Sequence, residues 1–404
     1  MPRHCQPFDV VHIAHTSFPD DQRPRREALL AAEGGKRVAV IAARYGLDPR
    51  PVSRYGPLAV IRLPGERRRG AFGKYVMEYT GFLVRAWLLM RRDSRFRSAR
   101  VVHVHSLPDF LVAAAGPARR QGARVILDLH EIFPEFMRTK FPGLLGRLAE
   151  PLVRLAERWS RRQADVVLTV NRETHALLHA RSSHATERLV IVHNAPAIDD
   201  FGPAREPAGA VHSPARLAYH GTLTYLYGLD LAVTALAMAR SSGIRATLAI
   251  FGDGPERPHL ERLVSELGLT SEVTLRGAVS HRVLRDELPT FDAGFLPTRL
   301  DGMTRYSLST KLLEYVHLGI PLMTARLPSY LRYFPEGAAW YFAPDDPASA
   351  AASIIAFVTA PNHERRTRAL LAQRSSADIA WPIEAARLRA VYDELLDPLR
   401  RAPS

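Results

Sequence analysis

The sequence predicts two successive α/β domains, each a doubly wound parallel sheet, and three observations support this fold class. Short runs rich in Val, Ile and Ala alternate with helical patterns along both halves of the chain, as in parallel sheets covered by helices. The runs are continuously apolar, which is expected of strands buried on both faces. A stretch dense in Pro, Ala and Gly at 194–214 interrupts the alternation, and we interpret it as an interdomain linker.

In the first half, β-branched runs predict seven strands, and helical patterns lie between them. The strands are expected at 10–15, 38–43, 59–63, 101–105, 125–130, 166–170 and 189–193. The helices are expected at 25–33, 75–91, 110–121, 143–163 and 172–181.

In the second half, the alternation restarts and ends in a helical tail. Strands are expected at 216–220, 246–251, 273–276, 293–297, 322–325 and 339–342, and late helices at 348–359, 363–374 and 381–396. At 404 residues the chain is too long for one core. We therefore predict an N-terminal domain over 1–205, a second domain over 206–380, and a helical tail over 381–404 that packs back toward the first. In such sheets ligands bind beyond the carboxyl ends of the strands, so two facing sheets would share a cleft.

The final helix has an apolar face at helical spacing, which predicts that this face is buried. Its residues are Leu388, Val391, Tyr392 and Leu395.

The stretch 305–325 reads as a loop, a helix with one acid, and a buried strand. Ser307 is the expected N-cap, and Gly319 ends the helix. An apolar helical face is formed by Leu312, Leu313, Val316 and Leu318. Free N–H groups at the helix start, with Lys311 in its first turn, suit a phosphate, and Glu314 is able to accept hydrogen bonds from sugar hydroxyls. An isolated helical glutamate is ordinarily solvated, so that interpretation of Glu314 stays open.

Charge is distributed unevenly along the chain. Residues 1–205 hold 34 Lys and Arg against 20 Asp and Glu, whereas 206–404 hold 21 of each, so the first half carries the whole excess of +14. A basic half favours an anionic partner, such as nucleic acid, an anionic membrane surface or a phosphorylated acceptor. The alternative is an arginine-rich surface set by genome composition, since only four of the 55 basic residues are Lys.

The cysteine content and the apolar runs of the sequence indicate the cellular compartment of the protein. The single cysteine, Cys5, excludes an internal disulfide and favours a reducing compartment. The apolar run 10–14 is too short for a signal peptide, and the run 81–90 is short and interrupted by Arg85. We expect a cytoplasmic protein without a membrane span.

Glycine turns follow successive strands of the second half. They are Gly221-Thr222, Asp253-Gly254 and the turn 277–281, and a further loop follows 295–298. Glycine lets a ligand phosphate approach the backbone closely. Each turn alone is only a strand-to-helix connection, but together they predict a series of loops at one edge of one sheet.

The ordered motifs of this chain resemble the retaining family 4 glycosyltransferases of the GT-B fold over nearly its whole length. In the second half these motifs are GTLTYLYGLDLAVTALA, AIFGDGPERPHLERLVSELGLTSEVTLRGAVSH, FDAGFLPT and STKLLEYVHLGIP. In the first half they include VVHVHSLPDFLVAAA, ILDLHEIFPEF, RRQADVVLTVNRET and LVIVHNAP.

The resemblance implies a role for each matching residue of the second half. Glu314 would hold the nucleotide ribose, Gly221 and Thr222 would face the diphosphate, and Asp253 and Gly254 would mark the next donor-side turn. The turn containing Val279 would lie under the base. Backbone N–H groups near the helix start would meet the phosphates, at Ser307, Leu308, Ser309 and Thr310.

In the first half, the resemblance makes His130 the histidine that contacts the transferred sugar, with Glu131 beside it as the second expected catalytic residue. It implies no separate cofactor, since a UDP- or GDP-linked sugar is the co-substrate. The acceptor would be lipid-linked or a glycan, and no nucleic acid is implied.

Two departures from the family pattern concern charge. Eight residues before Glu314, where the family often has a second glutamate, stands Tyr306. The basic pair of the first donor-side turn is replaced by Thr222 and Tyr227. The diphosphate must then be neutralised elsewhere, and the candidates are Arg299, Arg305 and Lys311. The first-domain turn 16–25 lacks a glycine pair, so it also departs from the family pattern at the acceptor-side loop.

No metal site is expected. The family needs none, and the sequence has no Asp-x-Asp. His103 and His105 alternate on one strand face but have no clear third ligand nearby in sequence, so we interpret them as satisfied cleft or core histidines. Without a metal or a dedicated base, the leaving phosphate can take the acceptor proton.

The basic half has candidate surfaces for a membrane. The helix 144–162 combines an apolar stripe with five arginines, which fits peripheral membrane association, whereas packing against the sheet explains the stripe equally. Arg67, Arg68, Arg69 and the arginines of 91–100 are further candidates for anionic lipid.

We therefore expect a metal-independent hexosyltransferase of surface-polysaccharide or glycolipid assembly, cytoplasmic or peripheral at the inner face of the membrane. Three alternatives stay open: a nucleotide-sugar epimerase of the same fold, a catalytically silent sugar-nucleotide-binding protein, and a basic nucleic-acid-binding protein. The last would need aromatic stacking positions among the arginines, and the sequence has no such motif.

Overall fold

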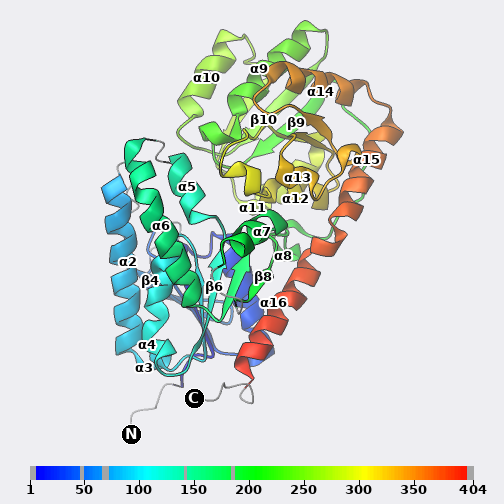
Figure 1. The fold of residues 1–404 in the computed structure, drawn as a ribbon. Helices are drawn as coiled ribbons and strands as arrows, with labels where there is room; N and C mark the ends of the chain where they lie inside the picture. The colour runs from blue at the N-terminus through cyan, green and yellow to red at the C-terminus, as the bar shows by residue number, and fades with distance from the viewer. Residues whose placement is uncertain (1–5, 46–49, 66–71, 141–142, 183–186, 398–404) are drawn as a thin grey trace. The chain divides into compact units, whose positions relative to one another are not determined.

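The computed structural model describes residues 6–45, 50–65, 72–140, 143–182 and 187–397 and divides into two compact units (Figure 1). The first unit is Met1–His193 together with Pro382–Ser404, and the second is Asn194–Trp381. The final helix is thus part of the first unit. The second unit begins upstream of the boundary expected at 206, because the segment predicted as a linker packs on it and buries Phe201 in its core.

The first unit contains an eight-stranded sheet of order β3-β4-β2-β1-β5-β6-β7-β8. All neighbours are parallel except β3 and β4. The antiparallel edge strand β3 was not predicted, because alternate residues are exposed and it has no apolar run. The strands are β1 (Val10–Ser17), β2 (Val38–Ala43), β3 (Val52–Tyr55), β4 (Leu58–Leu63), β5 (Val101–His105), β6 (Arg124–Leu129), β7 (Val166–Thr169) and β8 (Leu189–Ile191).

Helices cover the two faces of this sheet with different chemistry. On one face, Val11, Val102 and Leu127 pack with α2 and the 3-10 helix η2 in an apolar core. The opposite face carries His12, His103 and Asp128, all fully buried. The helices are α1 (Gln22–Ala31), α2 (Phe72–Arg92), α3 (Ser94–Arg97), α4 (Gly116–Arg119), α5 (Phe133–Lys140), α6 (Leu144–Arg162), α7 (Arg172–Ala180) and α16 (Trp381–Leu396), with η1 (Glu33–Gly35) and η2 (Asp109–Ala115).

Two helical predictions in the first unit were wrong in detail. The helix expected at 110–121 is η2 followed by the single turn α4, because Pro117 has no N–H to continue an α-helix from Ala113. On α16, Leu388, Val391 and Tyr392 are buried as predicted, but Leu395 is half-buried and Leu396 takes the interior position.

The second unit contains a six-stranded parallel sheet of order β11-β10-β9-β12-β13-β14. All six strands lie where the sequence predicts them, to within a residue or so at the ends. They are β9 (Ala215–His220), β10 (Ala246–Phe251), β11 (Val273–Gly277), β12 (Ala293–Leu296), β13 (Leu322–Ala325) and β14 (Trp340–Phe342).

Helices of the second unit bury one continuous apolar core against this sheet. In Figure 1, α9 and α14 lie side by side. The helices are α8 (Ile198–Phe201), α9 (Leu229–Ser241), α10 (Arg257–Glu266), α11 (His281–Glu287), α12 (Thr310–His317), α13 (Pro328–Leu331), α14 (Pro347–Thr359) and α15 (Asn362–Ser375), with η3 (Tyr225–Tyr227), η4 (Leu288–Thr290), η5 (Thr304–Tyr306), η6 (Glu336–Ala338) and η7 (Ala377–Ile379).

Among the described residues, no helix has the length and apolar character needed to cross a bilayer. Cys5 and the basic run Arg67, Arg68 and Arg69 lie outside the described residues.

Candidate functional site

In the second unit, the predicted glycine turns meet at the carboxyl edge of the sheet. Gly221 N donates to Phe251 O (2.8 Å), and Gly252 N donates to Gly277 O (2.7 Å). These hydrogen bonds link the loop after β9 to the end of β10, and the loop after β10 to the end of β11. A Cβ at Gly252 would lie 1.8 Å from Gly221 O. Two of these loops therefore approach closer than any side chain would permit.

Helix α12 begins at this edge of the sheet, and its acid, Glu314, lies next to the end of β9. Its N-cap is Ser309, in place of the predicted Ser307, and no side chain caps it. Glu314 is 5% exposed, which rules out a solvated helical acid, and its Oε2 lies 3.2 Å from Nε2 of the buried His220. Burial, followed by the charge of Lys311, holds the pKa of His220 well below its usual value. The neutral form of the His220 imidazole is therefore favoured.

Lys311, in the first turn of α12, lies directly against the first glycine turn. A Cβ at Gly221 would come within 2.1 Å of Lys311 Cε, and Gly221 has a φ of 128°, so a side chain here would displace Lys311 and strain the backbone. Its Nζ lies 4.1 Å from the ring centre of Tyr227 and 5.7 Å from that of Tyr219. No carboxylate among the described residues lies at ion-pair distance from it. Its charge is thus held beside the loop by aromatic faces.

The other two candidate cations have different surroundings. Arg299 pairs with Asp345 Oδ1 (2.7 Å) and Asp230 Oδ2 (2.5 Å) and stacks on Tyr225, so two carboxylates already satisfy its charge. Arg305 is exposed on η5 and lies over the Tyr306 ring. Of the three candidates, Lys311 is the one directed at the glycine turns.

The remaining predicted donor-side residues lie in the same set of loops. Thr222 and Asp253 are exposed, and Asp253 Oδ1 accepts from Gly254 N (2.7 Å). Val279 packs partly on the core before α11. The segment entering α12 runs over the core through the buried Leu308, flanked by Ser307, Ser309 and Thr310.

In the first unit, His130 follows β6 at the carboxyl edge of its sheet. Its side chain is 18% exposed, and Nε2 donates to Asp128 Oδ2 at 2.8 Å. Its backbone N–H donates to Ser106 Oγ (3.1 Å). Glu131 is half-buried in the turn before α5. His130 is thus fixed at both backbone and ring, which suits a residue that orients a ligand.

Asp128 is held in turn by Arg23 of α1, which sequence reasoning missed. Arg23 Nη2 donates to Oδ1 (2.7 Å) and Nε to Oδ2 (2.8 Å), and all of these atoms are buried. Burial would raise the pKa of Asp128, but the charge of Arg23 and the bonds from His105 and His130 hold that pKa well below its usual value. The available signal was the position of Asp128 two residues before His130, because residues two apart in an extended segment point to the same face.

Behind Asp128, three histidines line the same face of the sheet. Strand register pairs His12 with His103 and His105 with Asp128. The rings of His103 and His105 stack 4.3 Å apart, and His12 Nδ1 lies 3.0 Å from His105 Nε2. Burial lowers the pKa of each of the three imidazoles. Side chains of β1, α1 and β6 therefore contact His103 and His105. Sequence reasoning did not find these partners.

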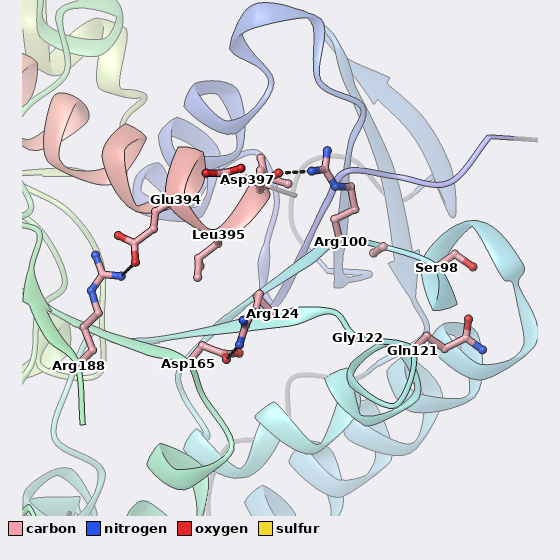
Figure 2. A pocket seen from close by; sticks show the side chains of 12 residues that line it. Ser98, Arg100, Gln121, Gly122, Arg124, Asp165, Arg188, Glu394, Leu395 and Asp397 are labelled. Atoms are coloured by element: carbon pink, nitrogen blue, oxygen red, sulfur yellow. Dashed lines mark hydrogen bonds and ion pairs between the residues drawn. The ribbon is translucent and has the colours of Figure 1, made fainter. Parts of the chain in front are cut away.

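A cavity of about 340 Å³ lies at the opposite, amino edge of the first sheet (Figure 2). Four of its charged lining residues form two ion pairs, Arg188 with Glu394 (2.6 Å) and Arg124 with Asp165 (2.8 Å). Since ligands of doubly wound sheets bind at the carboxyl edge, and these charges are already satisfied, this cavity is not the candidate site.

Two family models match the chain, one in each unit. The model described as a glycosyl transferase 4-like domain matches 24–195, and the model described as glycosyl transferases group 1 matches 214–360. The chain is 27% identical over 304 residues to the alpha-D-kanosaminyltransferase of Streptomyces kanamyceticus, covering 72% of each. It is 25% identical over 379 residues to the glycogen synthase of Mycobacterium tuberculosis, covering 90% of this chain and 87% of that enzyme.

Solved structures show the same fold. The sucrose-phosphate synthase of Thermosynechococcus elongatus superposes with a TM-score of 0.76 at 16% identity, covering 96% of this chain and 99% of that one. Anabaena HepE in complex with UDP-glucose superposes with a TM-score of 0.67 at 13% identity, with the same coverage. The matches in both units and the architecture of the two sheets lead to one conclusion: the chain belongs to the family 4 glycosyltransferases, which have the GT-B fold and catalyse glycosyl transfer.

Proposed function

We propose that the protein is a retaining glycosyltransferase that moves a hexosyl group from a UDP- or GDP-linked sugar to a hydroxyl acceptor, without a metal in the transfer step. The acceptor is a lipid-linked or glycan hydroxyl in surface-polysaccharide or glycolipid assembly. The solved complex of HepE with UDP-glucose supports a nucleotide-sugar donor. No further cofactor is needed for this reaction.

The observation that carries the proposal is the arrangement of α12 in the second unit. Glu314 is buried beside His220, one turn after Lys311, which lies against Gly221. A carboxylate is an acceptor for the two hydroxyls of a ribose, and a cation beside a glycine turn suits the adjoining diphosphate. In this proposal the acid contacts the ribose and the cation contacts the diphosphate, so one helix binds both parts of the nucleotide.

Lys311 and the first-turn N–H groups of α12 supply positive charge where the leaving diphosphate develops negative charge. In this proposal, this stabilisation takes the place of a metal ion. The departing phosphate oxygen then takes the proton of the acceptor hydroxyl on the face from which it left, which gives retention of configuration. In this scheme no side chain has to act as a general base.

In the first unit, we assign His130 to the transferred sugar. Asp128 holds one ring nitrogen of His130, so the other is left to bond a sugar hydroxyl. Glu131 follows it in the same turn and is the second residue proposed to contact the reacting groups.

We propose cytoplasmic, peripheral association with an anionic membrane through α6. The buried side of this helix is formed by Val153, Glu157, Ser160 and Arg161. A separate apolar stripe points outward, with Leu152 70%, Leu155 62% and Trp159 41% exposed. Arg158 and Arg162 are exposed next to this stripe. Packing against the sheet does not require the outward residues, so membrane association is favoured over the packing explanation.

A thermal-shift panel of UDP, GDP, ADP and their sugars tests the donor site. We expect one nucleoside diphosphate to raise the unfolding temperature of the wild type and to do so less in Glu314→Gln. The matched control is Glu266→Gln, which removes an exposed glutamate from α10 and should leave the shift intact. If no nucleotide stabilises the wild type, the assignment is wrong.

The reaction itself is tested by the product formed from the preferred donor. NMR of the glycoside should show the anomeric configuration of the donor, and added Mg²⁺ or Mn²⁺ should not change the rate. Free nucleotide with no glycoside would favour an epimerase, and binding without turnover would favour a silent sugar-nucleotide-binding protein.

A further inference from the structure

Five buried metal-binding side chains from four elements converge on one face of the first sheet. His12 lies on β1, His103 and His105 on β5, Asp128 on β6, and Glu27 on α1. Each is at most 1% exposed. Such a density of imidazole and carboxylate groups has no counterpart in an ordinary apolar core, where charged groups are rarely buried without compensation.

Four of these side chains have the spacing of a tetrahedral ligand set. His103 Nε2 lies 3.6 Å from Glu27 Oε2 and 3.9 Å from Asp128 Oδ2. His105 Nδ1 lies 3.9 Å from Glu27 Oε2 and 3.1 Å from Asp128 Oδ2. Tetrahedral zinc with bonds of about 2.0–2.2 Å separates its ligand atoms by about 3.3–3.6 Å. All four ligand atoms lie within 4.8 Å of one another, so modest shifts of the side chains would close the site around an ion.

Two of the four atoms that face the centre of this set, Glu27 Oε2 and His103 Nε2, have no hydrogen-bond partner among the described residues. Both are buried, as is Glu27 Oε1, which also has no hydrogen-bond partner among these residues. Asp128 Oδ2 already accepts from Arg23 Nε and His130 Nε2. Leaving a buried polar atom unsatisfied costs roughly 1–3 kcal/mol. A bound cation would satisfy Glu27 Oε2 and His103 Nε2 at once.

Each of the four ligands is also supported on its far side, as ligands of real metal sites are. His103 Nδ1 bonds the hydroxyl of Tyr392 (2.7 Å), and His105 Nε2 bonds His12 Nδ1 (3.0 Å). Arg23 lies 2.7 Å from Asp128 Oδ1 and 3.2 Å from Glu27 Oε1. These outer contacts leave Glu27 Oε2, His103 Nε2 and His105 Nδ1 close to Asp128 Oδ2 at the centre of the set.

We infer that Glu27, His103, His105 and Asp128 form a structural site for a divalent transition metal ion of the zinc type. Two imidazoles and two carboxylates suit zinc, cobalt or manganese. The ion would join α1, β5 and β6, and through Asp128 it would lie one side chain behind His130. This site is independent of the proposed transfer chemistry, which uses no metal.

The competing explanation is a proton in place of the ion. A protonated Glu27 facing Asp128 would also relieve the repulsion of two buried carboxylates. The substitution Glu27→Gln separates the two, because a glutamine amide imitates a protonated carboxyl group but is a poor metal ligand.

The test is the metal content of tag-free protein expressed with added zinc, measured by mass spectrometry. We expect one zinc ion per chain in the wild type, and loss of it in Glu27→Gln and His103→Asn with a lower unfolding temperature. The control is Glu384→Gln, a buried glutamate that bonds His193 elsewhere in the unit, which should keep its zinc. Two outcomes would overturn the inference. One is that both site variants retain zinc. The other is that the wild type lacks stoichiometric metal and the Glu27→Gln variant is as stable as the wild type.

If the variants do not fold, the wild-type protein alone tests whether the metal site exists. After removal of metal with a strong chelator, zinc should restore the unfolding temperature, and cobalt(II) should give the visible absorption of a tetrahedral site. Absence of both responses contradicts the proposed site.

Discussion

The Nζ atom of Lys311 lies 4.1 Å from the ring centre of Tyr227, and a Cβ at Gly221 would come within 2.9 Å of the same Nζ atom. Tyr227 stands where the family pattern has a basic residue, so the cation of this site comes from α12.

We predict that Lys311→Gln weakens UDP or GDP binding by roughly 10-fold to 100-fold, the effect of about 1.5–3 kcal/mol for a charged hydrogen bond. Calorimetric titration with the diphosphate and with the bare nucleoside measures this, and only the diphosphate should be affected. Arg262→Gln, an exposed change on α10, is the control, and equal losses for nucleoside and diphosphate would contradict the assignment.

The contact between Gly254 and the first donor-side loop predicts a stability defect. A Cβ at Gly254 would lie 2.3 Å from Leu223 O, and backbone cannot move aside as a flexible side chain can. Gly254→Ala should lower the free energy of unfolding of the second unit by about 1–3 kcal/mol, as overpacking does. Gly302→Ala, where nothing lies within 4 Å of the added methyl, should have little effect in the same denaturant titration. Similar stability of the two variants would show that the loops separate easily.

His130 should affect turnover more than donor binding, because we assign it to the transferred sugar. His130→Ala should lower kcat roughly 10-fold to 100-fold, as expected from loss of a hydrogen bond worth about 1–3 kcal/mol. The unfolding-temperature shift caused by the nucleoside diphosphate should not change. His179→Ala, an exposed histidine of α7, serves as the control. An unchanged kcat would remove His130 from the reaction.

Asp109 should make the first unit less stable as pH rises. Both carboxylate oxygens are buried without a hydrogen-bond partner among the described residues, and burial raises the pKa of Asp109 well above its usual value, aided by Glu157 and opposed by Arg161. The folded protein keeps this proton where the unfolded chain, with a pKa of about 3.9, has lost it. Folding then takes up a proton, so the contribution of Asp109 to stability is present at low pH and declines as pH rises above about 4.

Asp109→Asn tests this, because the amide cannot ionise. The variant should gain unfolding free energy relative to the wild type at pH 8 and gain less at pH 5, measured by denaturant titration at both values. A gain that does not depend on pH would mean that Asp109 is ionised in the folded protein.

The outward stripe of α6 predicts lipid binding. Replacing Leu152, Leu155 and Trp159 together by serine should abolish co-sedimentation with vesicles containing anionic lipid and leave the unfolding temperature nearly unchanged, because these side chains are exposed. Met238→Ser, at an exposed methionine of the second unit, is the control. Lipid binding that persists in the triple variant would contradict the role of α6, and binding to neutral vesicles alone would contradict the role of its arginines.

Local patterns were sufficient to predict most strands and helices. Buried parallel strands have continuous Val, Ile and Ala runs, so strands such as β2, β5 and β10 were predicted with the observed bounds. The failures have local causes as well, since β3 is an exposed edge strand and Pro117 interrupts a helix. The linker prediction failed because composition does not indicate that Phe201 is buried in the second core.

The sequence by itself determined the fold class, the glycine turns and the helix that carries Glu314 and Lys311, because these depend on periodicity within a few residues. Only the tertiary structure decided which polar groups meet. His220 comes within 3.2 Å of Glu314, and His12 bonds His105 across 93 residues of chain. Such pairs are set by strand order and register, which bring distant residues to one face of a sheet, and no pattern within a single strand contains that information.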